Sequence, residues 1–338
     1  MALNKQPLVK SSFGNLVNFT DADDADSVVR AAEAEPDALP DALYAAHGFL
    51  LMKGMNGISG DPALLERLSR LFGSEVENYH QTLMSANCIH TEVPEIFIVS
   101  NVPPVDRPPP PRPEPPLTED GKLPTRFPHR RGWHTDQSYR RPPPDISLFY
   151  ADVPVPKGQG QTLYADCVAA YDALPSALKS RVDDLVGIHV RPGSGRTEQA
   201  VRAGEAPHPL GPLEQPQRQP VVRIHPVTGN RSLYLCEAGQ MDWTEGPFVG
   251  MEPGPEGDGA ALLYEIMSHL TQPHFVYAHE WDEGDLVIYD NRNLLHAATW
   301  FDSEKHSRVM WRTTVRGNPG AKYAGEQNSW LPAENIAD

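Results

Sequence analysis

The residues of this chain best suited to chemistry are His134 and Asp136, in the stretch Gly-Trp-His-Thr-Asp at residues 132–136. On an extended backbone, residues i and i+2 point to the same face, so one metal ion can bind both side chains. An imidazole nitrogen and a carboxylate oxygen suit a first-row transition metal, and one further histidine would complete a 2-His-1-carboxylate facial triad. Such a triad leaves coordination positions open for a co-substrate and O2.

The His-x-acid pattern is weak evidence by itself, because the chain has 13 histidines and His90 and Glu92 show the same spacing. The third ligand is also open, since seven later histidines are candidates: His189, His225, His269, His274, His279, His296 and His306. We favour His296 because it follows a predicted strand that ends in the polar turn at residues 290–292. This position places it at the mouth of a barrel and not within a wall.

Two arginines near the C-terminus, Arg308 and Arg312, are four residues apart in a predicted strand and therefore share one face. Fe(II) bound by two neutral histidines and one carboxylate retains a positive charge, which attracts a chelating dicarboxylate. Burying the far carboxylate of such a ligand without a partner costs on the order of several kcal/mol, so a guanidinium is expected beside it. The alternative is that both arginines are ordinary surface residues.

Composition excludes several classes of function. The chain has 338 residues and a formal net charge of -16, which argues against binding nucleic acid or an anionic membrane. We find no secretory signal, and no apolar run approaches the roughly 20 residues of a membrane span. Cys88, Cys167 and Cys236 are widely spaced, which favours free thiols in a reducing cytoplasm. The expected partner is a small molecule, and homo-oligomerisation stays open.

The elements that must position these residues indicate a mainly β fold with flanking helices. The first 80 residues are predicted to be helical with one strand. Helices are predicted at residues 61–73, 168–186 (interrupted by Pro175) and 260–270. Strands are predicted at residues 47–52, 95–100, 145–155, 219–225, 232–235, 275–281, 286–290 and 308–315. Many short strands with long loops favour a jelly-roll barrel wrapped by helices, in one domain over residues 1–338.

Two long loops interrupt this pattern. Residues 103–128 are rich in proline, which lacks the amide donor that a helix or interior strand needs. The segment is either a solvated linker or a loop over the site, and we favour the loop because it leads directly to His134. Residues 192–218 form a second loop-like segment. Both are candidate active-site lids.

Together these residues resemble the TauD/TfdA-like (taurine/2,4-D dioxygenase) family of Fe(II)/2-oxoglutarate-dependent dioxygenases. The resemblance covers residues 48–317 and rests on the stretches at 132–136, 158–166 (GQGQTLYAD), 281–292, 296 and 308–312. It implies a double-stranded β-helix (jelly-roll) core with iron on His134, Asp136 and His296. It further implies that Arg308 holds the far carboxylate of 2-oxoglutarate, with Thr162 as its hydroxyl partner. Arg312 matches a second family arginine, which contacts 2-oxoglutarate or an anionic substrate, whereas His90 and Glu92 match no ligand.

The activity that the resemblance implies is hydroxylation, or oxidative cleavage, of a small anionic organic substrate, with O2 consumed and succinate and CO2 released. In related halogenases a small residue replaces the carboxylate ligand, so the presence of Asp136 favours hydroxylation. Two alternatives from other classes are a non-catalytic jelly-roll metal-binding protein, such as a sensor, and a metal-assisted hydrolase.

The residues that would bind the substrate are less well defined. Arg130, Arg131, Arg140 and Arg141 flank the metal motif, either as a solvated surface or as a positive field that attracts an anion. Trp133, Tyr139 and Phe149 are candidates for an apolar wall or for ordinary core packing. His80 is a loose counterpart of a pocket histidine found in sulfonate-handling relatives.

Overall fold

The computed structural model describes residues 2–73, 75–112, 132–140, 142–212, 214–237 and 239–316. Eight strands form its large sheet: β1 (Leu3–Pro7), β2 (Asn15–Phe19), β3 (Phe49–Met52), β4 (Glu75–Val76), β5 (Phe97–Ser100), β6 (Ile146–Val153), β13 (Leu286–Asp290) and β15 (Val309–Arg316). Their order is β1-β2-β3-β13-β6-β15-β4, and β5 pairs with β15 beside this path. The pairs are antiparallel except for β2 with β3.

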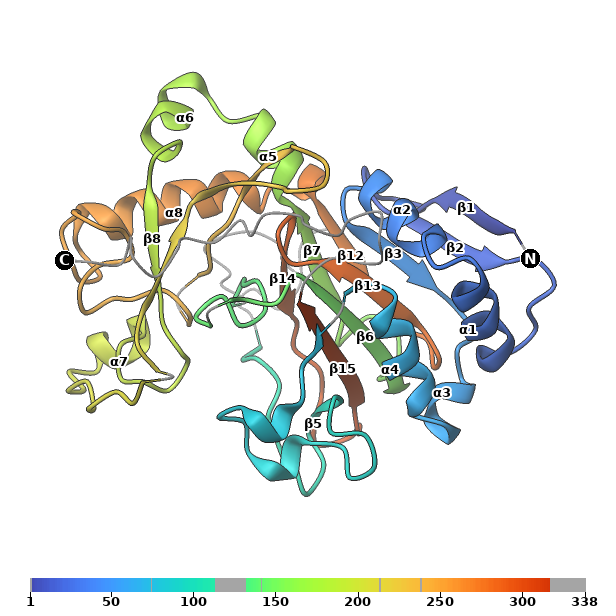
Figure 1. Ribbon diagram of the computed structural model, residues 1–338. Helices are drawn as coiled ribbons and strands as arrows, with labels where there is room; N and C mark the ends of the chain where they lie inside the picture. Colours follow the sequence, from blue (N-terminus) through green and yellow to red (C-terminus); the bar gives the residue numbers. More distant parts are fainter. Residues whose placement is uncertain are drawn as a thin grey trace.

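A second, antiparallel sheet consists of β7 (Thr162–Asp166), β12 (Val276–His279) and β14 (Leu294–Ala298), in the order β12-β7-β14. Two further antiparallel pairs are β8 (Val186–His189) with β9 (Gln217–Pro220), and β10 (Val222–Ile224) with β11 (Arg231–Leu233). Figure 1 shows β7 and β14 beside β6 and β15 in the middle of the molecule.

The large sheet and the three-stranded sheet enclose a core between them. Phe149 of β6 lies in one buried cluster with Tyr164 of β7 and Leu294 of β14. Leu148 and Tyr150, the neighbours of Phe149, belong instead to a cluster on the other face of β6. Because side chains alternate along a strand, every second residue points into the space between the sheets.

Helices cover the outer faces of both sheets. They are α1 (Ala25–Ala34), α2 (Ala38–Ala45), α3 (Gly57–Gly60), α4 (Ala63–Arg70), α5 (Cys167–Asp172), α6 (Ser176–Val182), α7 (Glu198–Arg202) and α8 (Asp258–Leu270), with single turns η1 (Tyr79–Gln81), η2 (Ala86–Cys88) and η3 (Pro273–Phe275). Apolar residues of α1, α2 and α4 pack on the large sheet, and those of α5, α6 and α8 pack on the outer face of β7 and β14. Figure 1 shows α1–α4 beside the N-terminal strands, with α5 and α6 at the top of the view and α8 on the left.

Most predicted strands are present, with ends shifted by at most two residues. The predicted strand at 219–225 is two strands, β9 and β10, and the predicted helix at 168–186 is two helices separated near Pro175. The prediction of a single strand in the first 80 residues is wrong, because β1, β2 and β4 also lie there. The loop predicted at 192–218 contains α7 and the start of β9. In the described parts of the chain, no helix combines the length and the apolar character needed to cross a membrane.

Candidate metal centre

The three predicted metal ligands meet between the two sheets. One potential ligand atom from each of His134, Asp136 and His296 lies within 4.8 Å of the others, and this is the one such cluster among the described residues. Two backbone hydrogen bonds join the histidines: His134 N donates to His296 O at 2.9 Å, and His296 N donates to His134 O at 2.8 Å. This short antiparallel bridge brings the motif at 132–136 beside β14.

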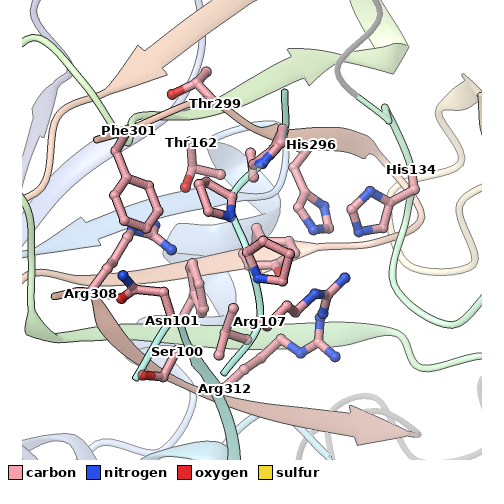
Figure 2. A pocket seen from close by; sticks show the side chains of 17 residues that line it. Ser100, Asn101, Arg107, His134, Thr162, His296, Thr299, Phe301, Arg308 and Arg312 are labelled. Atoms are coloured by element: carbon pink, nitrogen blue, oxygen red, sulfur yellow. Dashed lines mark hydrogen bonds between the residues drawn. The ribbon is translucent and has the colours of Figure 1, made fainter. Parts of the chain in front are cut away.

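The prediction that His296 lies at the barrel mouth and not within a wall is wrong, because His296 is the central residue of β14, in the barrel wall. Its neighbours Leu295 and Ala297 pack in the helix-covered core, so alternation points the imidazole of His296 to the inner face. Figure 2 shows the rings of His134 and His296 next to each other at one side of the cavity, with centroids 4.3 Å apart.

Hydrogen bonds fix the ligand atom of His134. Its Nδ1 lies 2.7 Å from the carbonyl oxygen of Gly132, and a carbonyl can only accept, so the proton is on Nδ1. Nε2 therefore carries the lone pair that can bind a metal. The hydrogen bond from Nδ1 to the Gly132 carbonyl orients the ring, as in many metal-binding histidines. On His296, Nε2 is the atom near the carboxylate, 3.7 Å from Asp136 Oδ1.

The two carboxylate oxygens of Asp136 have different surroundings. Oδ2 accepts hydrogen bonds from Tyr289 Oη at 2.6 Å and Ser147 Oγ at 2.7 Å. Oδ1 faces His296 and accepts a short hydrogen bond from Arg312 Nη1. Oδ1 is therefore the oxygen oriented to bind a metal, which would compete with Arg312 for it.

Burial and charge keep all three side chains in their metal-binding protonation states at neutral pH. Burial lowers the pKa of His134, and burial together with the neighbouring His134 lowers the pKa of His296 to about 3. Burial alone would raise the pKa of Asp136, but Arg312 and the two imidazoles outweigh it and hold that pKa well below its usual range. The donor set is thus two neutral nitrogens and one carboxylate, which fits Fe(II) in a facial triad.

Neighbouring backbone and side-chain groups hold the motif in place. Asn291, which follows β13, accepts a hydrogen bond from Asp136 N at 3.2 Å through Oδ1, and its Nδ2 donates to Ser147 Oγ at 2.9 Å. The carboxylate of Glu237 accepts hydrogen bonds from Gly132 N and Trp133 N at 3.1 and 3.2 Å. These contacts fix both ends of the motif from two distant parts of the chain.

A cavity of about 290 Å³ opens in front of the metal ligands. Its polar lining includes two histidines, a threonine and three arginines: His134, His296, Thr162, Arg107, Arg308 and Arg312. Its apolar lining includes aromatic rings and prolines: Phe149, Phe301, Pro108, Pro109 and Pro110. Figure 2 shows Arg308 near Phe301 on one side of the cavity and Arg312 on another. As the four-residue spacing predicts, both arginines line the same space, whereas Trp311 packs on the opposite face of the sheet.

Arg308 is a buried cation, 7% exposed, with no carboxylate of a described residue within ion-pair distance. Its Nε has no hydrogen-bond partner there, and burial lowers its pKa to about 10. Thr162 Oγ1 accepts a hydrogen bond from Trp281 Nε1 at 3.0 Å, which leaves the hydroxyl proton available for another acceptor. The pair therefore fits an anionic ligand, as a distal carboxylate of 2-oxoglutarate would be.

Other predicted residues lie elsewhere. His80 is exposed, Trp133 is buried in the helix-covered core, and Tyr139 lines a second cavity of about 220 Å³ together with Arg140. None of these lines the cavity at the metal ligands. Arg130, Arg131 and Arg141, with residues 113–128 of the proline-rich segment, lie outside the described residues.

The rival ligand His90 has a structural role. Its Nδ1 accepts hydrogen bonds from Glu92 N and Val93 N at 3.2 and 3.3 Å, and its ring packs against Trp311 with centroids 5.0 Å apart. Glu92 is exposed. The described part of the chain therefore gives this pair no third ligand.

Several residues of the site were not predicted from the sequence. They include Tyr289, Ser147 and Asn291, which continue the inward-facing positions of β6 and β13. The alternation of the strands was sufficient to predict that these side chains point inward, but not that they form hydrogen bonds with Asp136. Arg107 was not predicted either, although it is one of few cations in the proline-rich segment.

Comparison with known proteins shows the family of this chain. The family model described as "Taurine catabolism dioxygenase TauD, TfdA family" matches residues 18–314. The chain belongs to this family. The predicted resemblance is therefore confirmed.

Two curated members of the family are similar in sequence. The (S)-phenoxypropionate/alpha-ketoglutarate-dioxygenase of Sphingobium herbicidovorans is 36% identical over 197 residues, which cover 57% of this chain and 64% of that protein. The alpha-ketoglutarate-dependent 2,4-dichlorophenoxyacetate dioxygenase of Cupriavidus pinatubonensis is 34% identical over 183 residues, 54% of this chain and 59% of that protein. The chain thus aligns with less than two thirds of the length of either relative.

A solved structure, AAD-2 in complex with Mn(II) and N-oxalylglycine, superposes with a TM-score of 0.66 at 27% identity. The superposition covers 94% of this chain and 98% of that chain. This likeness confirms the predicted fold class, a mainly β jelly roll with flanking helices.

Proposed function

We propose that this chain is an Fe(II)/2-oxoglutarate-dependent dioxygenase that hydroxylates, or oxidatively cleaves, a small anionic organic substrate and releases succinate and CO2. One observation carries the proposal. A two-histidine, one-carboxylate cluster and the buried guanidinium of Arg308, which lacks an acidic partner among the described residues, border the same cavity.

In this proposal each part of the cavity has a separate task. His134, Asp136 and His296 hold Fe(II), which with 2-oxoglutarate and O2 would supply the oxidation of a C–H bond. Arg308 and Thr162 bind the distal carboxylate of 2-oxoglutarate and so fix its orientation. Phe149, Phe301 and the three prolines at residues 108–110 exclude water from the reacting atoms.

The arginines support an anionic substrate. Arg312 remains beside the metal ligands once Arg308 is assigned to 2-oxoglutarate, and it can contact either 2-oxoglutarate or the substrate. Both curated relatives are named for carboxylated substrates. Neither a sensor nor a metal-assisted hydrolase would explain why Arg308 is buried without a carboxylate partner among the described residues.

We also propose that residues 1–338 form one domain and that the described part of the proline-rich segment, residues 103–112, covers the site, since residues 107–110 line the cavity. No described residue of the segment 192–218 lines it, so the structure gives no support for a second lid there. The three cysteines are free, which fits the cytoplasmic location that we propose.

The test is a screen of carboxylates, sulfates, sulfonates and phosphates, scored by succinate release. Release should require Fe(II), 2-oxoglutarate and O2 together. His134→Ala and Asp136→Ala should abolish both metal binding and turnover, whereas His90→Ala should retain iron. Turnover without O2 would favour a hydrolase, and metal binding without succinate release on any substrate would favour a sensor. Loss of iron in His90→Ala would overturn the ligand assignment.

A further inference from the structure

The indole of Trp281 lies behind one of the residues proposed to bind the distal carboxylate of 2-oxoglutarate. Trp281 follows the end of β12 by two residues, is 4% exposed, and belongs to the buried cluster between the two sheets. Its Nε1 donates a hydrogen bond of 3.0 Å to Thr162 Oγ1. Thr162 lines the cavity, whereas Trp281 does not. Trp281 can therefore influence a ligand in the cavity only through the side chains that it contacts.

Two aromatic rings pack edge-to-face against this indole. The ring centroids of Phe149 and Trp281 lie 5.3 Å apart at an interplanar angle of 88°, and those of His279 and Trp281 lie 4.4 Å apart at 87°. His279 is itself held, because its Nε2 donates to Asp285 Oδ2 at 3.1 Å and its Nδ1 lies 3.0 Å from Tyr277 Oη. These contacts confine the indole to one orientation and so fix the direction of its N–H group.

The hydrogen bond from Trp281 determines how the hydroxyl of Thr162 can act. The hydroxyl and the methyl group of a threonine exchange places between side-chain rotamers. Because an indole N–H can only donate, it selects the rotamer in which Oγ1 accepts this hydrogen bond, and it occupies one lone pair of that oxygen. The hydroxyl proton is then directed to a different acceptor. A carboxylate is the acceptor that the proposed function supplies.

The contact of Trp281 with Phe149 leads to Arg308. The guanidinium of Arg308 lies over the ring of Phe149, 6.0 Å from its centroid. Figure 2 shows Arg308 and Thr162 on the same side of the cavity, away from His134. Trp281 thus contacts both the hydroxyl group and the aromatic ring beside which this guanidinium lies.

We infer that Trp281 is a positioning residue for 2-oxoglutarate, which acts through Thr162 and contacts neither the co-substrate nor the metal. This inference rests on the proposed function for the identity of the ligand. A tryptophan needed only for packing could lose its N–H group without consequence for the cavity. A tryptophan that orients Thr162 reduces the side-chain freedom that is lost on binding, because the donor is in place before the carboxylate arrives.

The test is a double-mutant cycle on Trp281 and Thr162 in the full-length protein loaded with Mn(II). The ligand is N-oxalylglycine, in which an NH replaces one CH2 of 2-oxoglutarate, and its affinity is measured from the rise in unfolding temperature with ligand concentration. Trp281→Phe should weaken this affinity roughly fivefold, as expected when one hydrogen bond is lost. Thr162→Val should weaken it by at least as much. In the Thr162→Val background, Trp281→Phe should cause no further loss.

Trp243→Phe is the matched control. Trp243 is also buried, but it lies in the helix-covered core and its Nε1 has no hydrogen-bond partner among the described residues. The control should keep N-oxalylglycine affinity within about twofold of wild type. Trp281→Phe should leave Mn(II) affinity unchanged, because neither Thr162 nor Phe149 is a proposed metal ligand.

Two results would overturn the role of Trp281. One is an affinity for N-oxalylglycine in Trp281→Phe equal to that of the wild type. The other is an equal loss of affinity on Trp281→Phe in the wild-type and Thr162→Val backgrounds, because Trp281 would then act through packing and not through the hydroxyl of Thr162.

Steady-state kinetics separates this inference from the proposed function. With a substrate found by the succinate screen, Trp281→Phe should raise KM for 2-oxoglutarate roughly fivefold and leave kcat and KM for the substrate within about twofold. A general distortion of the cavity would change all three constants. If no compound supports succinate release, the proposed function fails, and the cycle with N-oxalylglycine still decides the role of Trp281. If the wild-type protein does not bind N-oxalylglycine, the co-substrate site and this role of Trp281 are both wrong.

Discussion

Asp136 presents one carboxylate oxygen to the metal position and has the other held by two hydroxyl groups. Tyr289→Phe removes one of the two donors to Oδ2, the hydrogen bond of 2.6 Å. Residues that orient a metal ligand typically contribute roughly 10–100-fold to metal affinity. We therefore expect Tyr289→Phe to weaken Fe(II) or Co(II) binding within that range, as measured by anaerobic titration of the visible absorption of Co(II).

Tyr164 offers the matched control for Tyr289. Its ring is fully buried and packs against His296 with centroids 6.0 Å apart, but its hydroxyl has no hydrogen-bond partner among the described residues. Tyr164→Phe therefore removes an unsatisfied hydroxyl and should leave metal affinity within about twofold of wild type. If both variants weakened metal binding equally, loss of packing and not the hydrogen bond to Asp136 would be the cause.

The buried charge of Arg308 destabilises the folded protein when no anionic ligand is bound. Burial lowers the pKa of Arg308 to about 10, so the unfolded chain binds this proton more tightly than the folded one. The loss of folding free energy caused by this shift is fully present below about pH 10. It diminishes as pH rises from the pKa of Arg308 in the folded protein towards its pKa in the unfolded chain. Arg308→Gln should thus raise the free energy of unfolding of the metal-free protein, by about 1–3 kcal/mol at pH 7.5, and raise KM for 2-oxoglutarate. Urea unfolding and steady-state kinetics measure the two effects, and a less stable variant would contradict this account.

At the scale of elements, the turn after β13 connects the outer strands to the metal motif. Gly48, just before β3, accepts a hydrogen bond from Asp290 N at 2.8 Å, and Asn291 then reaches Asp136. Gly48 has φ +88°, and an added Cβ would lie 2.8 Å from the Cβ of Asp290. An alanine here combines backbone strain with a direct clash.

We expect Gly48→Ala to lower the free energy of unfolding by about 2–4 kcal/mol and to weaken metal binding. Gly54→Ala is the control, because Gly54 has a similar φ of +74° but nothing within 4 Å of the added Cβ. It should cost only the backbone strain, about 1–2 kcal/mol, and leave metal affinity unchanged. Urea unfolding measures the stability of both variants, and metal titration measures their metal affinity. An unchanged metal affinity in Gly48→Ala would show that the turn after β13 does not position the metal motif.

At the scale of the whole molecule, metal and 2-oxoglutarate would connect the two sheets. The ligands come from β14 and from the motif beside it, whereas Arg308 immediately precedes β15 of the large sheet. A ligand at about 100 times its Kd stabilises the folded state by about 2.7 kcal/mol. Saturating Mn(II) with N-oxalylglycine should therefore raise Tm, by roughly 3–6 °C for a domain of this size.

Thermal unfolding of two variants separates the contribution of Mn(II) to this rise in Tm from the contribution of N-oxalylglycine. Asp136→Ala should lose the stabilisation by Mn(II), and with it that by N-oxalylglycine. Arg308→Gln should keep the stabilisation by Mn(II) and lose most of the addition from N-oxalylglycine. An unchanged Tm of the wild-type protein with both ligands would count against a site shared by the two sheets.

The sequence by itself determined the local features of this site. Alternation along a strand is a local property, so the spacing of His134 with Asp136 and of Arg308 with Arg312 was sufficient to predict shared faces. The order of the motifs was sufficient to predict the family. The strands β7 and β14 were not predicted, because their short runs carry no strong local signal and are defined by pairing with each other.

Only the tertiary structure decided which distant residues meet. It placed His296 within the wall of the small sheet and paired its backbone with His134. It also brought Tyr289 and Ser147 to one carboxylate oxygen and directed Arg107 towards Arg312. These contacts join segments far apart in the chain, and their register depends on strand pairing and packing between sheets, which no local pattern of residues specifies.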